Sequence, residues 1–369
     1  MGAAAGMVMA CNPAAATPPA QAATSQASHP ASTPSPVATP AAAQAPLLWN
    51  EIDDPQRVTP LLDENGNSEG SFPATWLVFS TLGSALLAGP SMANPQPLYE
   101  VRAGGVATPL ETVPNLEDAV GALDGHAWAW LTAGSAQLGC SGAGGSEELN
   151  IASAPGTGRV LASLPALPDR DSWKFVTWNA QGVVLQAMTC GLDAGPEGQL
   201  IAVDPSTGAM RSLTSHLAGC VFQDIADDGT MVCQPALTTE RVIRPDGSMK
   251  DFGPSAWGTG VCPDHGGVQG YEGVSLDQDG SRLALALTCS ELDTRFDRLA
   301  ILDTRTGAVT LGTPSVYLAP DGFLPDGTIL ANTPGTFATN PAGVSYLVSP
   351  SGIARLLATG QVEWDAHQG

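Results

Sequence analysis

The sequence VSLDQDGSRLALAL at residues 274–287 decides the fold, because two apolar segments flank a turn at Asp279 and Gly280. A second hairpin sequence, LAILDTRTG at residues 299–307, follows shortly after and ends its turn at Gly307. Glycine accepts the positive φ angles of tight hairpin turns, and aspartate and proline favour the turn positions before it. The two sequences therefore predict four consecutive antiparallel strands.

Both hairpin types recur along the chain. Turns of the first type lie near residues 124, 181, 228, 279 and 326. Turns of the second type lie within residues 200–208 and 299–307, and more loosely within 151–161, 242–252 and 346–357. Successive turns of the first type are about 45 to 57 residues apart, which suits four short strands with their loops. Four-stranded antiparallel sheets stacked radially are the blades of a β-propeller, so we predict an all-β fold of that class.

The number of blades follows from where the repeats begin and end. Six units begin near residues 72, 116, 172, 219, 271 and 315. Residues 47–62 resemble a lone hairpin of the second type, and residues 361–365 resemble an unpaired first strand. We predict seven blades, closed by pairing of the N- and C-terminal strands, which removes exposed sheet edges. Six blades with unpaired ends is the alternative.

The turn motifs also carry a family resemblance. The sequence LDQDGSRLAL at residues 276–285 is similar to the strand pair of TolB-like and PD40 bacterial propellers, and ILDTRTG at residues 301–307 resembles their second hairpin. The resemblance covers most of residues 72–357. It implies the blade structure and leaves the chemistry open, because such propellers bind proteins, peptides, sugars or nothing known.

The first 46 residues are expected to lie outside the folded domain. Residues 1–11 resemble a partial lipoprotein signal, because Val8-Met9-Ala10-Cys11 is similar to a lipobox. That resemblance implies a lipid on Cys11, although no Lys or Arg precedes Arg57, as a signal peptide would require. An Ala-rich leader without lipid is the alternative.

Residues 12–46 consist almost entirely of Ala, Pro, Thr, Ser and Gln, and such a composition cannot bury a core. We therefore expect a disordered linker at 12–46 that carries the propeller domain, residues 47–369. Elsewhere no apolar run approaches the length of a membrane span, which leaves a lipid anchor as the expected membrane contact. The predicted location is extracytoplasmic, either lipid-anchored to a bacterial membrane or secreted.

The charge balance limits the classes of partner. Thirty-six acidic side chains against 14 basic ones give a formal net charge of -22. A nucleic acid or an anionic lipid surface would be repelled by such a chain. We therefore expect no nucleic-acid partner, and a monomer that meets a protein, a peptide or a glycan at the envelope surface.

Cysteine usage favours an oxidising compartment. Besides Cys11 the chain has six cysteines: Cys140, Cys190, Cys220, Cys233, Cys262 and Cys289. In the predicted blades all six lie at one end of the strands, where first strands begin and second strands end. Of the fifteen pairings, this placement favours Cys220 with Cys233 and Cys262 with Cys289, and leaves Cys140 for Cys190. Such bonds persist outside a reducing cytoplasm. A zinc site is the rival interpretation, but Cys-x-x-Cys spacing is absent.

Candidate ligand-binding residues are few. Oxygen-bearing side chains alternate at Asp63, Asn65, Asn67 and Glu69, as at the start of a calcium loop, but the Gly and Glu expected at later positions are missing. A polar turn is the alternative, so we expect no cofactor, with calcium as the open option.

The loop at residues 253–267 holds the other candidates. Asp264 and His265 could form an acid-base pair beside Cys262, or an ordinary loop pair. Trp257 is in the same glycine-rich loop, where an aromatic side chain is often exposed for recognition.

Two functions remain open. The leading hypothesis is a non-catalytic binding or scaffolding lipoprotein that uses the cysteine-bearing end of the propeller, because no standard catalytic motif is present. The alternative is an extracellular hydrolase or lyase with its site in the central funnel. Carboxylates such as Asp224, Asp277 and Asp321 would then have to converge there.

Overall fold

The computed structural model places the propeller body of the chain. It describes residues 48–51, 58–63, 65–73, 76–81, 84–89, 94–102, 106–122, 125–133, 146–167, 171–189, 199–217, 219–257, 261–262, 268, 270–289, 297–312, 318–324, 326–333, 343–359 and 361–363. All of them belong to the compact unit Gln44–Gly369. The predicted signal at 1–11, with Cys11, and the linker at 12–46 lie outside the described residues, so these boundaries stay predictions.

The described residues form seven antiparallel sheets of four strands each. The first, or closing, sheet combines both ends of the chain: β28 (Gln361–Glu363), β1 (Leu48–Glu51), β2 (Val58–Leu62) and β3 (Ser68–Pro73). The second sheet has β4 (Trp76–Thr81), β5 (Ser84–Ala88), β6 (Gln96–Arg102) and β7 (Val106–Val113). The third has β8 (Leu116–Gly121), β9 (Trp128–Ala133), β10 (Glu147–Ala152) and β11 (Arg159–Ser163).

The other four sheets repeat this order. The fourth has β12 (Asp171–Asn179), β13 (Gly182–Thr189), β14 (Leu200–Val203) and β15 (Met210–Ser212). The fifth has β16 (Val221–Ile225), β17 (Met231–Ala236), β18 (Thr239–Ile243) and β19 (Met249–Phe252). The sixth has β20 (Gly270–Leu276), β21 (Arg282–Thr288), β22 (Asp297–Asp303) and β23 (Val309–Leu311). The seventh has β24 (Ala319–Phe323), β25 (Ile329–Thr333), β26 (Val344–Val348) and β27 (Ala354–Thr359). Two short 3-10 helices lie between sheets, η1 (Thr214–His216) and η2 (Pro254–Ala256).

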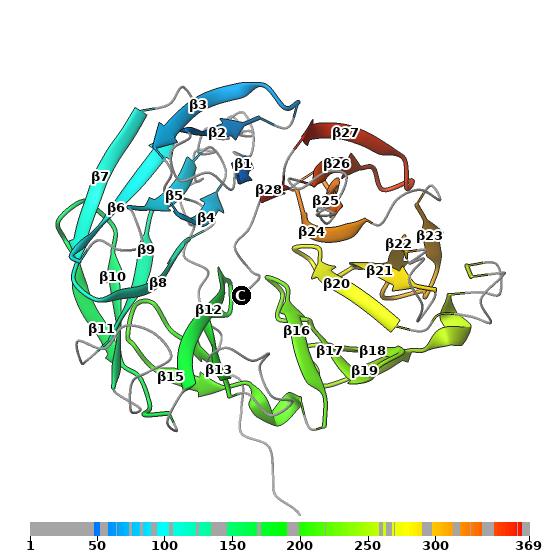
Figure 1. Ribbon diagram of the computed structural model, residues 1–369. Helices are drawn as coiled ribbons and strands as arrows, with labels where there is room; N and C mark the ends of the chain where they lie inside the picture. The colour runs from blue at the N-terminus through cyan, green and yellow to red at the C-terminus, as the bar shows by residue number, and fades with distance from the viewer. Residues whose placement is uncertain are drawn as a thin grey trace, which may run out of the picture. The chain divides into compact units, whose positions relative to one another are not determined.

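The sheets are arranged around a common centre, with the first strand of each sheet innermost (Figure 1). Each apolar sheet face packs against the next sheet, and this is the radial arrangement of a β-propeller. The predicted β-propeller fold is therefore confirmed. The predicted hairpin turns lie between first and second strands and between third and fourth strands, as at Gly280 and Gly307, where φ is +64° and +84°.

The chain ends pair with each other as expected. β28 lies antiparallel to β1, with Asn50 opposite Val362. One detail of the prediction is wrong: residues 47–62 do not supply the third and fourth strands of this sheet. β1 and β2 are its second and third strands, and β3 is the outer one. The error arose because the polar segment after Leu62 turns the chain back into a further strand, which lacks the apolar residues of the other repeats.

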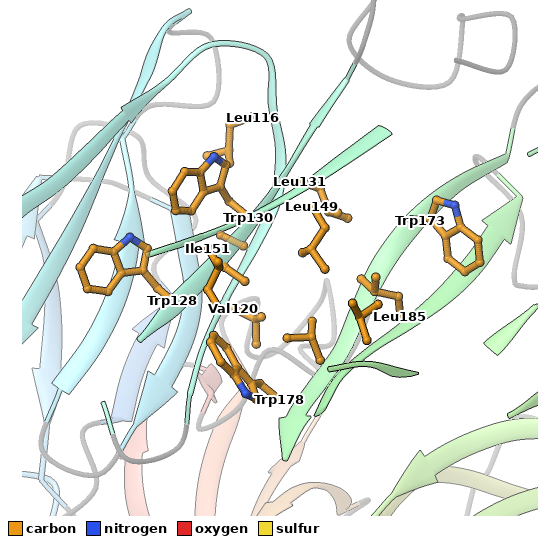
Figure 2. Packing of buried hydrophobic residues seen from close by; sticks show 14 of the residues in the cluster. Leu116, Val120, Trp128, Trp130, Leu131, Leu149, Ile151, Trp173, Trp178 and Leu185 are labelled. Atoms are coloured by element: carbon orange, nitrogen blue, oxygen red, sulfur yellow. The ribbon is translucent and has the colours of Figure 1, made fainter. Parts of the chain in front are cut away.

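Large apolar side chains fill the space between the second, third and fourth sheets. Trp128 and Trp130 from β9 and Trp173 and Trp178 from β12 belong to one buried cluster (Figure 2). Trp173 is almost fully buried, and its Nε1 donates to the carbonyl oxygen of Pro165 at 3.0 Å. The two β9 tryptophans therefore pack in the core between the sheets. The cluster also fixes β8 and β12 next to each other at the inner edge.

Candidate functional site

A bulge interrupts the inner strand of every sheet from the second to the seventh. The pairing with the second strand shifts by one residue at the same place each time, for example around Glu117 in β8 and Gln223 in β16. The other shifts lie in β4, β12, β20 and β24. A bulge bends the strand and re-aims the side chain at that position. The sequence gives no sign of it, because the extra residue leaves the apolar pattern on both sides intact.

An acidic group lies where the third sheet meets the inner strand of the fourth. One carboxylate oxygen of Asp118 accepts from the backbone N–H of Phe175 at 3.0 Å. Glu147, at the start of β10, accepts from the N–H of Trp173 with both oxygens, at 3.1 and 3.2 Å. Between them, Lys174 donates its ammonium to the carbonyl oxygen of Glu117 at 3.3 Å. Three consecutive residues of β12 are thus held by side-chain or backbone acceptors of the third sheet.

The hydrogen bonds have a common geometric cause. β12 pairs with β13 on one side only, so the N–H groups of Trp173 and Phe175 point toward its free edge. A buried N–H group without an acceptor destabilises the fold, and a carboxylate supplies a strong one. We call such a contact an edge cap: a side chain of one sheet that bonds the free inner edge of the next.

Edge caps recur at two further junctions. Asp224 in β16 accepts from the N–H of Leu276 in β20 at 2.7 Å, which joins the fifth and sixth sheets. At the closing sheet, Ser345 Oγ accepts from the N–H of Val362 at 2.8 Å, and Asn332 Nδ2 donates to the carbonyl oxygen of the same residue at 2.9 Å. The hydroxyl of Ser345 in turn donates to Asn332 Oδ1 at 2.6 Å.

Burial changes the acidity of the group at the third sheet. Desolvation raises the pKa of Glu147 to about 7, and the nearby Glu117 carboxylate adds to the effect. Desolvation also raises the pKa values of Glu117 and Asp118, although Lys174 opposes the shift in both. One oxygen of Glu117, Oε2, is buried and has no hydrogen-bond partner in the structure. A carboxyl group that titrates near neutral pH and bonds an inner strand, as Glu147 bonds β12, is a feature of many functional sites.

The second candidate region is the end of the sheets where first strands begin and second strands end. We call it the stapled face, because the disulfides Cys220–Cys233 and Cys262–Cys289 lie there, at the fifth and sixth sheets. Both pairings were predicted and are confirmed. Cys140 and Cys190 lie outside the described residues, so their pairing stays a prediction.

Trp257 on the stapled face is not exposed. Only 3% of its surface is accessible, so the expectation of an exposed recognition aromatic is wrong. Its indole Nε1 donates to the hydroxyl of Tyr271 at 2.7 Å, and the two rings meet edge to face with centroids 5.5 Å apart. The hydroxyl of Tyr271 donates to the carbonyl oxygen of Thr238, in the turn between β17 and β18. The glycine-rich composition suggested an open loop, but the start of that loop folds back onto the core.

The same turn covers a buried acid. Glu240 in β18 has no accessible surface, and its Oε1 accepts from Gln234 Nε2 at 3.3 Å. Its Oε2 is buried and has no hydrogen-bond partner in the structure. Desolvation raises its pKa to about 8. Glu240 is not among the residues predicted from the sequence, although it shares the buried face of β18 with Val242, and that alternation was the available signal.

The remaining predicted residues have these outcomes. Asp63 Oδ1 accepts from the N–H groups of Asn65 and Asn67, each at 2.8 Å, so this segment forms the polar turn between β2 and β3. Calcium binding by Asp63, Asn65, Asn67 and Glu69 stays an untested prediction. Asp264 and His265 lie outside the described residues. Among the described residues, no group of three or more His, Cys, Asp or Glu side chains is placed to hold a metal ion.

The three funnel carboxylates do not share one place. Asp224 and Asp321 are on the inner strands β16 and β24, but Asp277 lies in the turn after β20. There its Oδ2 accepts from Arg282 Nε and Ser281 Oγ, both at 2.9 Å. No helix in the described part of the chain is long and apolar enough to cross a membrane.

Comparison with known proteins places the chain by its fold. No protein-family model and no curated protein matches the sequence. Among solved structures, a prolyl endopeptidase aligns with a TM-score of 0.58 at 12% identity, over 89% of this chain and 50% of that one. An oligogalacturonate lyase from Vibrio parahaemolyticus aligns with a TM-score of 0.50 at 14% identity, over 86% and 87%. TolB from Acinetobacter baumannii aligns with a TM-score of 0.42 at 13% identity, over 86% and 65%.

The chain thus spans half the length of the endopeptidase and 65% of TolB. At these identities the likeness is one of fold. A shared fold does not determine the function.

Proposed function

We propose that residues 47–369 form a non-catalytic binding or scaffolding domain, held outside the bacterial cytoplasm by a lipid on Cys11 and the linker at 12–46. The edge caps carry this proposal. Asp118 and Asp224 are inner-strand carboxylates of the kind that a funnel enzyme would use, and Glu147 lies at the start of the third strand, β10. Each of the three accepts a backbone N–H of the next sheet. Their hydrogen bonds hold the sheets together, which suits a rigid platform.

The stapled face is the proposed contact surface, and the β17–β18 turn is its best-defined part. Leu237 at the tip of the turn is 78% exposed. The residue beside it is fixed, because Thr238 accepts from Tyr271, and Gln234 Nε2 lies 3.5 Å from the carbonyl oxygen of Leu237. An apolar side chain on a preorganised turn loses little entropy on binding. The expected partner is a protein, peptide or glycan at the envelope, met by a monomeric propeller.

Placement outside the cytoplasm is supported by the two disulfides, because such bonds persist in oxidising compartments. Intact-mass and N-terminal analysis of the native protein tests it. A diacylglyceryl adduct on Cys11 and no free thiols in the body would support the proposal. An unmodified N-terminus together with free thiols at the body cysteines would refute it.

Binding is tested by crosslinking in envelope extracts with Leu237→Asp. The matched control is Ile353→Asp, since Ile353 is 66% exposed but lies in the β26–β27 turn, at the opposite end of the strands. Loss of a captured partner with Leu237→Asp alone supports the stapled face. Equal capture by both variants and the unmodified protein would show that this surface is not the contact.

The alternative function, a hydrolase or lyase with its site at the inner strands, is favoured by one observation. Glu147 has a pKa of about 7 and lies near Glu117 and Lys174, so it could hold or release a proton at neutral pH. Purified protein should be tested on glycan, peptide and lactone substrates. Turnover that Glu147→Gln abolishes, and that the exposed control Glu148→Gln retains, would favour the enzyme over the binding protein.

A further inference from the structure

The β17–β18 turn on the stapled face is fixed from below by a small polar cluster. Tyr271 reaches from β20 of the sixth sheet to the carbonyl oxygen of Thr238, and Trp257 donates to the Tyr271 hydroxyl. Gln234 from β17 donates to Glu240 from β18, so the two arms of the hairpin are bridged directly beneath the turn. Glu240 therefore accepts the hydrogen bond that joins the two strands directly beneath this turn.

The surroundings of Glu240 favour a neutral carboxyl. Phe252 lies directly opposite it on β19, and Trp257 belongs to the same buried cluster as Phe252. The titratable group that faces it from β20 is Tyr271, and a hydroxyl held in two hydrogen bonds does not neutralise a carboxylate. Arg241 and Asp251 form the adjacent cross-strand pair, next to Glu240 and Phe252. Their two side chains bond each other at 2.7 Å.

Alternation along a strand places that pair on the opposite face of the sheet from Glu240. No described cation is thus positioned to compensate a negative charge at Glu240. Ionisation would leave a buried, uncompensated carboxylate, with Oε2 lacking any donor. The hairpin can relieve this by opening toward solvent, and the exposed turn is the part of it that can move with least loss of packing.

We infer that Glu240 is a proton-operated latch: its neutral carboxyl holds the β17–β18 turn closed, and its ionisation releases the turn and with it Leu237. The effect on binding rests on the proposed function, but the latch itself is a property of the chain alone. The pKa supports the direction. Burial raises it from 4.5 to about 8, so the closed turn keeps a proton that the open turn loses.

The pH window follows from these values. Below the open-state pKa near 4.5 both states are protonated, and the latch is tightest. Between about 4.5 and 8 the open turn releases its proton while the closed turn keeps it, so opening becomes about tenfold more favourable for each pH unit. Above the closed-state pKa both states are ionised, and the dependence levels off.

Hydrogen exchange followed by mass spectrometry tests the latch on the intact protein from pH 5 to 9. The probe is the segment at residues 235–243, with rates corrected for intrinsic exchange and compared with residues 200–212. We expect protection of 235–243 to fall by about tenfold per pH unit up to about pH 7.5 and then to level off. A flat profile in this segment would refute the latch, whatever the variants show.

Two variants separate the latch from general loosening. Glu240→Gln retains the side-chain shape without a titratable group, so its protection should be independent of pH. Tyr271→Phe should loosen the turn at every pH while keeping the slope. A Glu240→Gln protein with the slope of the unmodified protein would overturn the inference. Intact pH dependence without any captured partner would refute the proposed function alone, and intact capture with a flat profile would refute the latch alone.

Discussion

Asn332 and Val362 join the last strand of the chain to the seventh sheet, through a 2.9 Å hydrogen bond from Asn332 Nδ2 to the Val362 carbonyl oxygen. Ser345 completes the contact by accepting from the N–H of Val362. Val362 and Ser345 have no accessible surface. Both backbone groups of Val362 at the free edge of β28 are thus satisfied by side chains of the preceding sheet.

Asn332→Ala should therefore weaken closure of the ring. It leaves the carbonyl oxygen of Val362 and the hydroxyl of Ser345 without this partner, at a cost of about 1–3 kcal/mol for a buried polar group. Urea unfolding at pH 7 measures the loss. The control is Gln278→Ala, an exposed side chain in the turn after β20, for which we expect a change within about 0.5 kcal/mol. Equal stability of the two variants would contradict the role of Asn332.

Asp118→Asn should destabilise the junction of the third and fourth sheets. Asp118 accepts from Phe175 with one oxygen and from Ala119 with the other, so an amide nitrogen in place of either oxygen faces a donor. We expect a loss of about 1–3 kcal/mol in the free energy of unfolding. The exposed Glu148→Gln, on the same sheet, should stay near the unmodified protein in the same denaturant series.

Gly280→Ala should destabilise the fold more than Gly247→Ala, although both glycines have positive φ. A Cβ at Gly280 would lie 2.6 Å from the Cβ of Thr230 in the fifth sheet, whereas a Cβ at Gly247 would meet nothing within 4 Å. Left-handed backbone costs about 1–2 kcal/mol in each. Overpacking should add about 1–3 kcal/mol at Gly280 alone. Thermal unfolding of both variants measures the difference, and equal costs would show that the sheets separate easily here.

Glu147→Gln should flatten part of the pH dependence of stability. The pKa of Glu147 is raised from 4.5 to about 7 in the folded protein, so the folded state binds the proton more tightly than the unfolded state. Its contribution to stability is full below about pH 4.5, falls as the pH rises, and is lost above about 7. Between pH 4.5 and 8, the free energy of unfolding of the glutamine variant should rise by about 1–3 kcal/mol relative to that of the unmodified protein. Denaturant unfolding across that range measures it, and a pH-independent difference would contradict the shift.

The sequence was sufficient for the architecture because its signals are local. Asp-Gly turns such as Asp279–Gly280 fix each hairpin, and the apolar segments around them fix which faces are buried. The pairing of Cys220 with Cys233 followed from the same local placement, since both lie at one end of neighbouring strands.

The edge caps could not be predicted in that way. Asp118 and Phe175 are 57 residues apart, and Asp224 and Leu276 are 52 apart. The contact depends on a one-residue bulge that aims the side chain across a sheet boundary, and composition carries no trace of it. The predicted exposure of Trp257 was wrong for a related reason, because its side chain packs against Tyr271, which lies in the next sheet.

The shared closing sheet sets the order in which the molecule can be finished. β1, β2 and β3 precede the other sheets along the chain, but the strand that completes their sheet, β28, ends at residue 363. Until that segment has been synthesised, the first sheet lacks its innermost strand, β28, and the hydrogen bonds that Asn332 and Ser345 make to it. The first sheet can therefore be completed only after the strands of the other six sheets have been synthesised.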